Sequence, residues 1–124
     1  MKKVDAVGRP ASLEDLRDAL RKFASDRDWS QFHSPKNLAI ALNVEAAELL
    51  EHFQWISEAE STALDSEQQA KVREEAADVL LYLIRLADKL GIDLLAVASE
   101  KIELNAKKYP VEKARGSSKK YTDL

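Results

Sequence analysis

Two pairs of acidic residues lie inside apolar segments of helical character, and they limit how these segments can pack. Glu45 and Glu48 lie in NLAIALNVEAAELLEHF, and Glu75 and Asp78 lie in EEAADVLLYLIRLADKL. Residues three positions apart share one face of a helix, so the carboxyl groups of each pair project together. Carboxylates are rarely buried unpaired, and these segments hold too few Lys or Arg residues to pair them locally. We therefore expect two facing helices to converge the four carboxyl groups, with a bound cation offsetting their repulsion.

Capping residues and apolar spacing predict the first two helices. Ser12 begins the first helix, with Asp15 completing a variant of the capping box, and the apolar pattern stops near Asp28. Ser34 and Pro35 begin the second helix as its N-cap and first-turn residues, and this helix runs to about residue 55. The connection between the two helices, WSQFH, is short and rich in aromatic side chains.

Two further helices follow a polar segment at residues 58–66, which we interpret as a loop with room for one helical turn. Asp65 or Ser66 caps the third helix, which ends at residue 90, before the C′ residue Gly91. Asp93 caps the fourth helix, which ends before Pro110. The chain has 3 Gly and 3 Pro among its 124 residues, so long helices can run without interruption.

The predicted fold class is all-α, and one helix needs more cover than a single chain provides. Residues 79–84, VLLYLI, are apolar around nearly the whole helix circumference, which is typical of a helix buried on all sides. Four helices are too few to enclose one of their own members, so we expect a partner subunit and a homo-oligomer. The predicted organisation is a flexible lead at 1–11, a helical domain at 12–110 that subunit association completes, and a basic tail at 111–124.

Composition narrows the class of protein. The net charge of −3 argues against a general binder of nucleic-acid polymers. Without cysteine, the chain can form neither disulfides nor thiolate metal sites. No apolar run approaches the roughly 20 residues of a membrane span, and the N-terminus, MKKVDAVGRP, lacks the apolar core of a secretory signal. The expectation is a cytoplasmic protein that does not associate with membranes.

The residue types around the acidic pairs select the kind of metal. Di-iron bundles use Glu-x-x-His motifs, but Ser30 precedes His33 by three residues and Leu49 precedes His52 by three. No cluster of His or Cys suits zinc. An all-oxygen site favours Mg²⁺, with Mn²⁺ as a substitute, and open coordination positions point to a substrate that carries phosphate.

Aromatic and basic residues outside the acidic pairs offer places for such a substrate. Trp29 lies in a polar connection, Trp55 lies at a helix end, and Tyr82 follows Asp78 by four residues on the same helix face. An aromatic side chain can stack on a base with roughly 1–3 kcal/mol. The fourth helix carries a polar stripe at i, i+4 and i+7, which is either a solvated surface or a phosphate contact: Lys101, Asn105 and Lys108.

Four segments of the chain resemble the all-alpha nucleotide pyrophosphohydrolases of the MazG superfamily, and specifically its dCTP pyrophosphatase-like branch. These segments are DRDWSQFHSPKNL, EAAELLEHFQW, EEAADVLLYLIRLAD and the KKYP…SSKKYTDL ending, and the resemblance covers about residues 12–124. The family places an ExxE and an ExxD motif on successive helices, here Glu45/Glu48 and Glu75/Asp78. Val44 replaces the first residue of the doubled Glu that is common in the superfamily, which leaves the number of bound ions open.

The resemblance implies a four-helix MazG-like bundle that cleaves dCTP or a modified dCTP between its α and β phosphates, giving dCMP and pyrophosphate. This housekeeping of the nucleotide pool would depend on Mg²⁺ bound by the four acids, with Glu48 as the preferred acceptor of a proton from the attacking water. A homotetramer, a dimer of dimers, is implied, with the tail folding over a site. The residues implied around the substrate are Trp29, His33, Trp55, Tyr82, Lys101 and Asn105.

Two alternatives to this function stay open. The same chemistry could act on another triphosphate, such as dATP, dUTP or an oxidised nucleotide, because base specificity depends on loop geometry. A helical oligomerisation module without catalysis is the alternative from another class of protein. It is disfavoured because a pure interaction helix has no use for four inward-facing acids.

Overall fold

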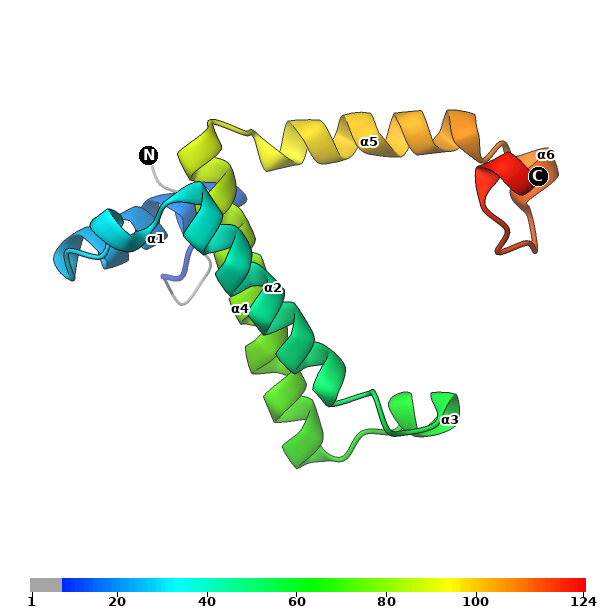
Figure 1. The fold of residues 1–124 in the computed structure, drawn as a ribbon, viewed down its shortest axis with the longest axis horizontal. Coiled ribbons are helices and arrows are strands. Elements are labelled where there is room, and N and C mark those ends of the chain that lie inside the picture. Colours follow the sequence, from blue (N-terminus) through cyan, green and yellow to red (C-terminus); the bar gives the residue numbers. More distant parts are fainter. Residues whose placement is uncertain (1–7) are drawn as a thin grey trace. The chain divides into compact units, whose positions relative to one another are not determined.

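The computed structural model describes residues 8–124, which form helices and connecting segments with no β-strand in that range (Figure 1). The all-α fold class is therefore confirmed. The chain up to Gly91 forms one compact unit, and Ile92–Leu124 forms a second one. The elements in chain order are α1 (Leu13–Asp26), the 3-10 turn η1 (Ser30–Phe32), α2 (Pro35–Glu51), α3 (Glu58–Ser61), α4 (Ser66–Leu90), α5 (Leu94–Lys108), α6 (Val111–Ala114) and the 3-10 turn η2 (Tyr121–Asp123).

The capping residues that the sequence indicates begin and end the long helices. The side chains of Ser12, Ser34, Asp65 and Asp93 each accept a hydrogen bond from a backbone N–H in the first turn of α1, α2, α4 and α5. Gly91 ends α4 in the left-handed conformation, with φ 67°, as a C′ glycine does. The starts of these helices were therefore predictable from local chemistry.

One helix ends earlier than its apolar pattern indicates. α2 stops at Glu51 rather than near residue 55, because the chain tightens into a turn there. The backbone N–H of His52 donates to Leu49 O at 3.3 Å, and that of Phe53 donates to Leu50 O at 2.9 Å, three residues back instead of four. Trp55 therefore lies in the connection that follows α2.

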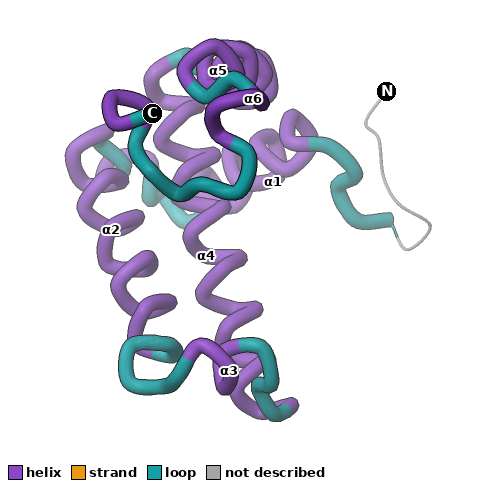
Figure 2. The backbone as a smooth tube through the Cα atoms, turned by 90° about the vertical axis from the view of Figure 1, so that its right-hand side faces the viewer, coloured by secondary structure: helices purple, strands orange, loops and turns teal. Residues whose placement is uncertain are grey.

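The first unit is organised around α2 and α4, which pack against each other and lie side by side in the ribbon of Figure 1 and the backbone tube of Figure 2. A connection carrying the single-turn helix α3 joins the end of α2 to the start of α4 (Figure 2). α1 also packs against α4. The apolar residues buried among those described are Ala24 of α1, Leu38 of α2, and Ile84 and Ala87 of α4. The facing of α2 and α4 is what brings the acidic pairs into one region.

The apolar stretch of α4 is covered on part of its circumference. Ile84 is 3% exposed, whereas Leu80 and Leu83 are 40% and 37% exposed in the single chain. That a partner subunit covers them stays a prediction. Within residues 8–124, no helix is both long enough and apolar enough to span a bilayer.

The second unit consists of α5, α6 and η2, and α5 has no buried residue. The end of α5 contacts the end of the chain. The ring of Tyr109, the C-cap residue of α5, meets the Tyr121 ring edge to face at 5.9 Å, and Lys108 Nζ lies 5.0 Å from the centre of the Tyr121 ring. The tail therefore packs against α5. That the tail covers a substrate site stays a prediction, as do the domain boundaries at residues 11 and 110.

An ion-pair network ties α1 to α4, and its loss should destabilise the protein. Arg21 Nε donates to Asp88 Oδ2 at 2.8 Å, and Arg85 Nη1 donates to the same oxygen at 3.3 Å. We expect Asp88→Asn to lower the free energy of unfolding by roughly 3 kcal/mol, because a buried guanidinium loses its counter-charge. Urea denaturation near neutral pH measures this change.

Acid should remove the same stabilisation. The hydrogen bond from Arg21 lowers the pKa of Asp88. The contribution is fully present above the ordinary aspartate pKa of about 3.9 and is lost as pH falls through the lowered value. Asp26→Asn is the matched control, since the Lys22–Asp26 pair at 2.7 Å is exposed and should contribute under about 1 kcal/mol. Equal destabilisation by both variants would contradict the prediction.

Candidate metal and nucleotide site

Three of the four predicted acids meet between α2 and α4. Glu45, Glu48 and Glu75 each offer a carboxylate oxygen, these oxygens lie within 4.8 Å of one another, and all three residues are half-buried. Asp78 lies one turn after Glu75 on α4, and its oxygens fall outside this group. The convergence that the spacing predicts is therefore present for three acids, and we call Glu45, Glu48 and Glu75 the acid cluster.

The environment of Glu45 shows the electrostatic cost of the acid cluster. The pKa of Glu45 is raised to about 7, first by burial and then by the neighbouring carboxyl group of Glu48, with smaller contributions from Glu75 and Asp78. Glu45 Oε2 and Glu75 Oε2 are also buried and form no hydrogen bond with any described residue. A hard cation binds carboxylate oxygens, so it would both offset their mutual repulsion and take the place of the missing hydrogen-bond donors.

One histidine beside the acid cluster was not among the predicted site residues. His52 Nε2 lies 3.8 Å from Glu75 Oε1. The available signal was that His52 follows Glu45 by seven residues, two helical turns.

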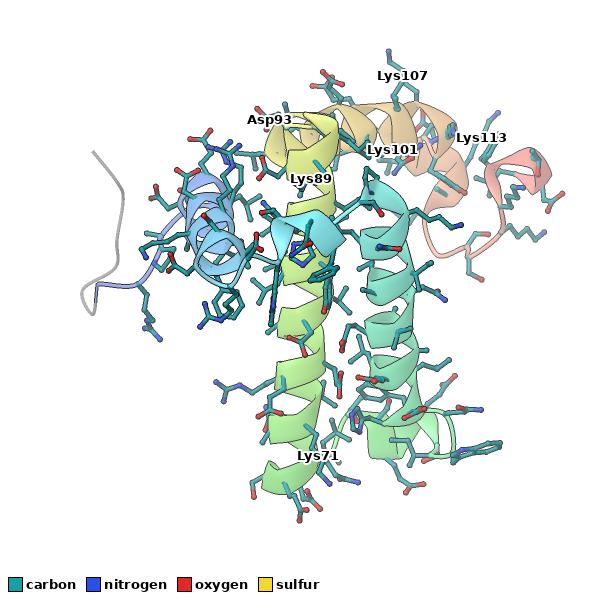
Figure 3. All side chains as sticks on the ribbon, turned by 60° about the vertical axis from the view of Figure 1, so that its left-hand side comes forward. Lys71, Lys89, Asp93, Lys101, Lys107 and Lys113 are labelled. Atoms are coloured by element: carbon teal, nitrogen blue, oxygen red, sulfur yellow. The ribbon has the colours of Figure 1, made fainter. Side chains whose placement is uncertain are left out.

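The labelled lysines of α4, Lys71 and Lys89, lie near opposite ends of that helix (Figure 3), and Lys71 pairs with Glu67 at 3.5 Å.

A cavity of about 210 Å³ gathers most of the predicted aromatic residues. Its lining residues are Leu20, Phe23, Ala24, Trp29, His33, Asp78, Leu81, Tyr82 and Arg85. Trp29 meets Phe23 at a ring distance of 5.7 Å and His33 at 6.5 Å, edge to face in both cases. Asp78 lines the cavity wall, so the fourth predicted acid lies between the acid cluster and the aromatic residues.

The remaining predicted contacts lie elsewhere in the chain. Trp55 is 86% exposed and does not line this cavity. Lys101, labelled in Figure 3, and Asn105 are exposed residues of α5, in the second unit. Lys108, the third member of that stripe, lies over the Tyr121 ring. The contacts predicted for Trp55, Lys101 and Asn105 with substrate stay predictions.

The fold and the acid cluster together define an all-α protein in which three half-buried carboxyl groups meet between two facing helices. The model of the MazG-like family matches residues 40–124, and the chain belongs to this family.

Known relatives agree with this assignment. The chain is 46% identical over 115 residues to dCTP pyrophosphatase 1 of Rattus norvegicus, and 43% identical over 115 residues to that of Homo sapiens. Each match covers 91% of this chain and 68% of the relative. The crystal structure of a pyrophosphatase from Archaeoglobus fulgidus is similar, with a TM-score of 0.75 and 43% sequence identity, over 79% of this chain and 92% of that one.

Proposed function

We propose that this protein is a nucleoside triphosphate pyrophosphohydrolase that converts dCTP, or a modified dCTP, to dCMP and pyrophosphate. The observation that carries the proposal is the acid cluster of Glu45, Glu48 and Glu75. Asp78, on the same helix as Glu75, lines the aromatic cavity and so links the cluster to it. The identity of 46% and 43% to dCTP pyrophosphatase 1 of rat and human supports the choice of substrate.

Mg²⁺ is the proposed cofactor, with Mn²⁺ as a substitute. The acid cluster and Asp78 would hold it, because their donor atoms are all carboxylate oxygens, which hard divalent ions prefer. The two buried oxygens without hydrogen bonds fit this role. When bound, Mg²⁺ supplies positive charge that offsets the negative charge of the phosphate oxygens.

Glu48 is the proposed general base. Its carboxylate accepts a proton from a water molecule whose oxygen forms a bond with the α-phosphorus, while the bond from that phosphorus to the bridging oxygen breaks. The electron pair leaves with pyrophosphate. A carboxylate in the acid cluster can accept this proton because it lies among the groups that would hold Mg²⁺, the ion that would offset the charge of the phosphates.

The aromatic cavity is the proposed nucleoside site. Trp29, His33 and Tyr82 supply ring faces and polar edges around about 210 Å³, and Asp78 lies at the same cavity. Trp55 is exposed in the single chain, so we propose that it contributes in a homotetramer, a dimer of dimers, together with Lys101 and Asn105. The exposed Leu80 and Leu83 of α4 support such an assembly.

Removing the Trp29 ring should weaken substrate binding. A base stacked on an aromatic side chain gains roughly 1–3 kcal/mol, so Trp29→Ala should raise KM for dCTP by about fivefold to about 150-fold. Phe32→Ala is the control, because Phe32 lies in the neighbouring turn η1, is 60% exposed and does not line the cavity. Steady-state kinetics decide the matter: equal KM values for the two variants would refute this role.

Release of pyrophosphate from each deoxynucleoside triphosphate, canonical and modified, tests the proposed function. We expect the highest kcat/KM for dCTP or a base-modified dCTP in the presence of Mg²⁺. A preference for dATP or dUTP would support the proposed pyrophosphohydrolysis but contradict dCTP as the substrate. No release from any triphosphate, with either Mg²⁺ or Mn²⁺, would favour a helical oligomerisation module.

A further inference from the structure

Arg85 is buried in the first unit and does not belong to the acid cluster. It is 7% exposed, and it is the one charged residue classed as buried among those described. Its Nε donates to His33 Nδ1 at 3.2 Å, its Nη1 to Asp88 Oδ2 at 3.3 Å and its Nη2 to Ser30 Oγ at 3.3 Å. Each nitrogen of the guanidinium therefore has a partner, and these contacts connect α4 with the aromatic connection that contains η1.

The contact with His33 determines which ring nitrogen carries the proton. A guanidinium only donates hydrogen bonds, so Nδ1 of His33 must present its lone pair to Arg85. A neutral imidazole that accepts at Nδ1 carries its proton on Nε2. The pKa of His33 is lowered by burial and by the charges of Arg85 and Lys89, which favours this neutral form. Nε2–H forms no hydrogen bond with residues 8–124, so it is available to an acceptor.

Arg85 itself is poorly placed to bind a phosphate. Its three nitrogens are already engaged by His33, Asp88 and Ser30, and Asp88 is held in turn by Arg21, through a bond of 2.8 Å from Arg21 Nε. Arg85 and His33 both line the aromatic cavity. The hydrogen bonds of Arg85 therefore fix the orientation of the His33 imidazole at the cavity wall.

We infer that Arg85 is a positioning residue, which holds His33 as the Nε2–H tautomer so that this nitrogen donates to an acceptor atom on the edge of a pyrimidine base. The inference rests on the proposed function for the identity of the base. A purely structural link between α4 and η1 would need only the hydrogen bond from Arg85 to Ser30. The hydrogen bond to His33 Nδ1 goes further, because it selects one of the two neutral tautomers of the ring.

Nitrogen NMR of histidine-labelled protein tests the inference without turnover. The chain has 2 histidines, so His52→Gln assigns the His33 signals. We expect His33 of the unliganded protein to show one neutral tautomer, protonated at Nε2, and the Nε2 signal to shift when dCMP is added. An Nδ1–H tautomer, or no response of Nε2 to saturating dCMP, would overturn the inference even if no Arg85 variant folds.

Substitution of Arg85 then separates positioning from general stability. Arg85→Met should give a mixture of tautomers and raise KM for dCTP about tenfold, the loss expected for one hydrogen bond of about 1.4 kcal/mol, while kcat changes less than KM. Ser30→Ala, which removes the Nη2 contact alone, should keep the single tautomer. Unchanged tautomer and KM in a folded Arg85→Met protein would refute the positioning role. If no triphosphate is hydrolysed at all, the proposed function fails, and the tautomer measurement still decides the role of Arg85.

Discussion

Glu48→Gln should reduce the rate of pyrophosphate release by about a thousandfold, because it removes a metal ligand and the proposed proton acceptor together. Gln keeps the shape of the side chain but carries no charge and cannot accept the proton. Single-turnover kinetics with saturating Mg²⁺ and dCTP measure the chemical step. Glu51→Gln is the matched control, since Glu51 is an exposed acid at the end of the same helix and should change kcat little.

Asp78→Asn should reduce the same rate to a similar degree. Asp78 lies outside the three-acid group, yet its charge contributes to the raised pKa of Glu45, and it lines the aromatic cavity. A residue in this position connects the acid cluster with the proposed nucleoside site. Full pyrophosphate release by both Glu48→Gln and Asp78→Asn would rule out the proposed chemistry.

The part of the candidate site that was predictable from the sequence is the part that spacing along a single helix determines. Three-residue spacing placed Glu45 with Glu48, and Glu75 with Asp78, because spacing along a helix defines a face. It could not predict the relative register of α2 and α4, which packing determines. The structure accordingly brings Glu75, but not Asp78, within 4.8 Å of the α2 acids.

The contacts of Arg85 and Arg21 with distant residues were not predicted from the sequence. Arg85 stands inside an apolar run, and a buried guanidinium requires partners, but its partner His33 lies 52 positions away. Arg21 and Asp88 are separated by 67 positions. The end of α2 was also misplaced, because the apolar pattern continues through residues that form a turn. Helix starts were more predictable since one capping side chain determines each of them.

Metal binding should reverse the pH dependence that Glu45 gives to stability. In the metal-free protein its pKa is about 7, above the ordinary glutamate value of 4.5. Between these values the folded state binds more protons than the unfolded state, so the contribution of Glu45 is fully present below the ordinary value. It is lost as pH rises through the folded value. We therefore expect Glu45 to make the metal-free protein less stable as pH rises from about 5 to about 8, in addition to the pH dependence that other groups contribute.

Mg²⁺ requires ionised ligands, so it should compete with the proton on Glu45. Its affinity should fall by up to about tenfold per pH unit below the folded pKa of Glu45, and its stabilising effect should be largest near pH 8. Isothermal titration calorimetry in buffers of different ionisation enthalpy measures both the affinity and the proton released. Glu45→Gln should weaken Mg²⁺ binding and remove most of its pH dependence, and full chelation of metal should abolish pyrophosphate release. Equal Mg²⁺ affinity at about pH 6 and about pH 8 would show that the ion binds away from Glu45.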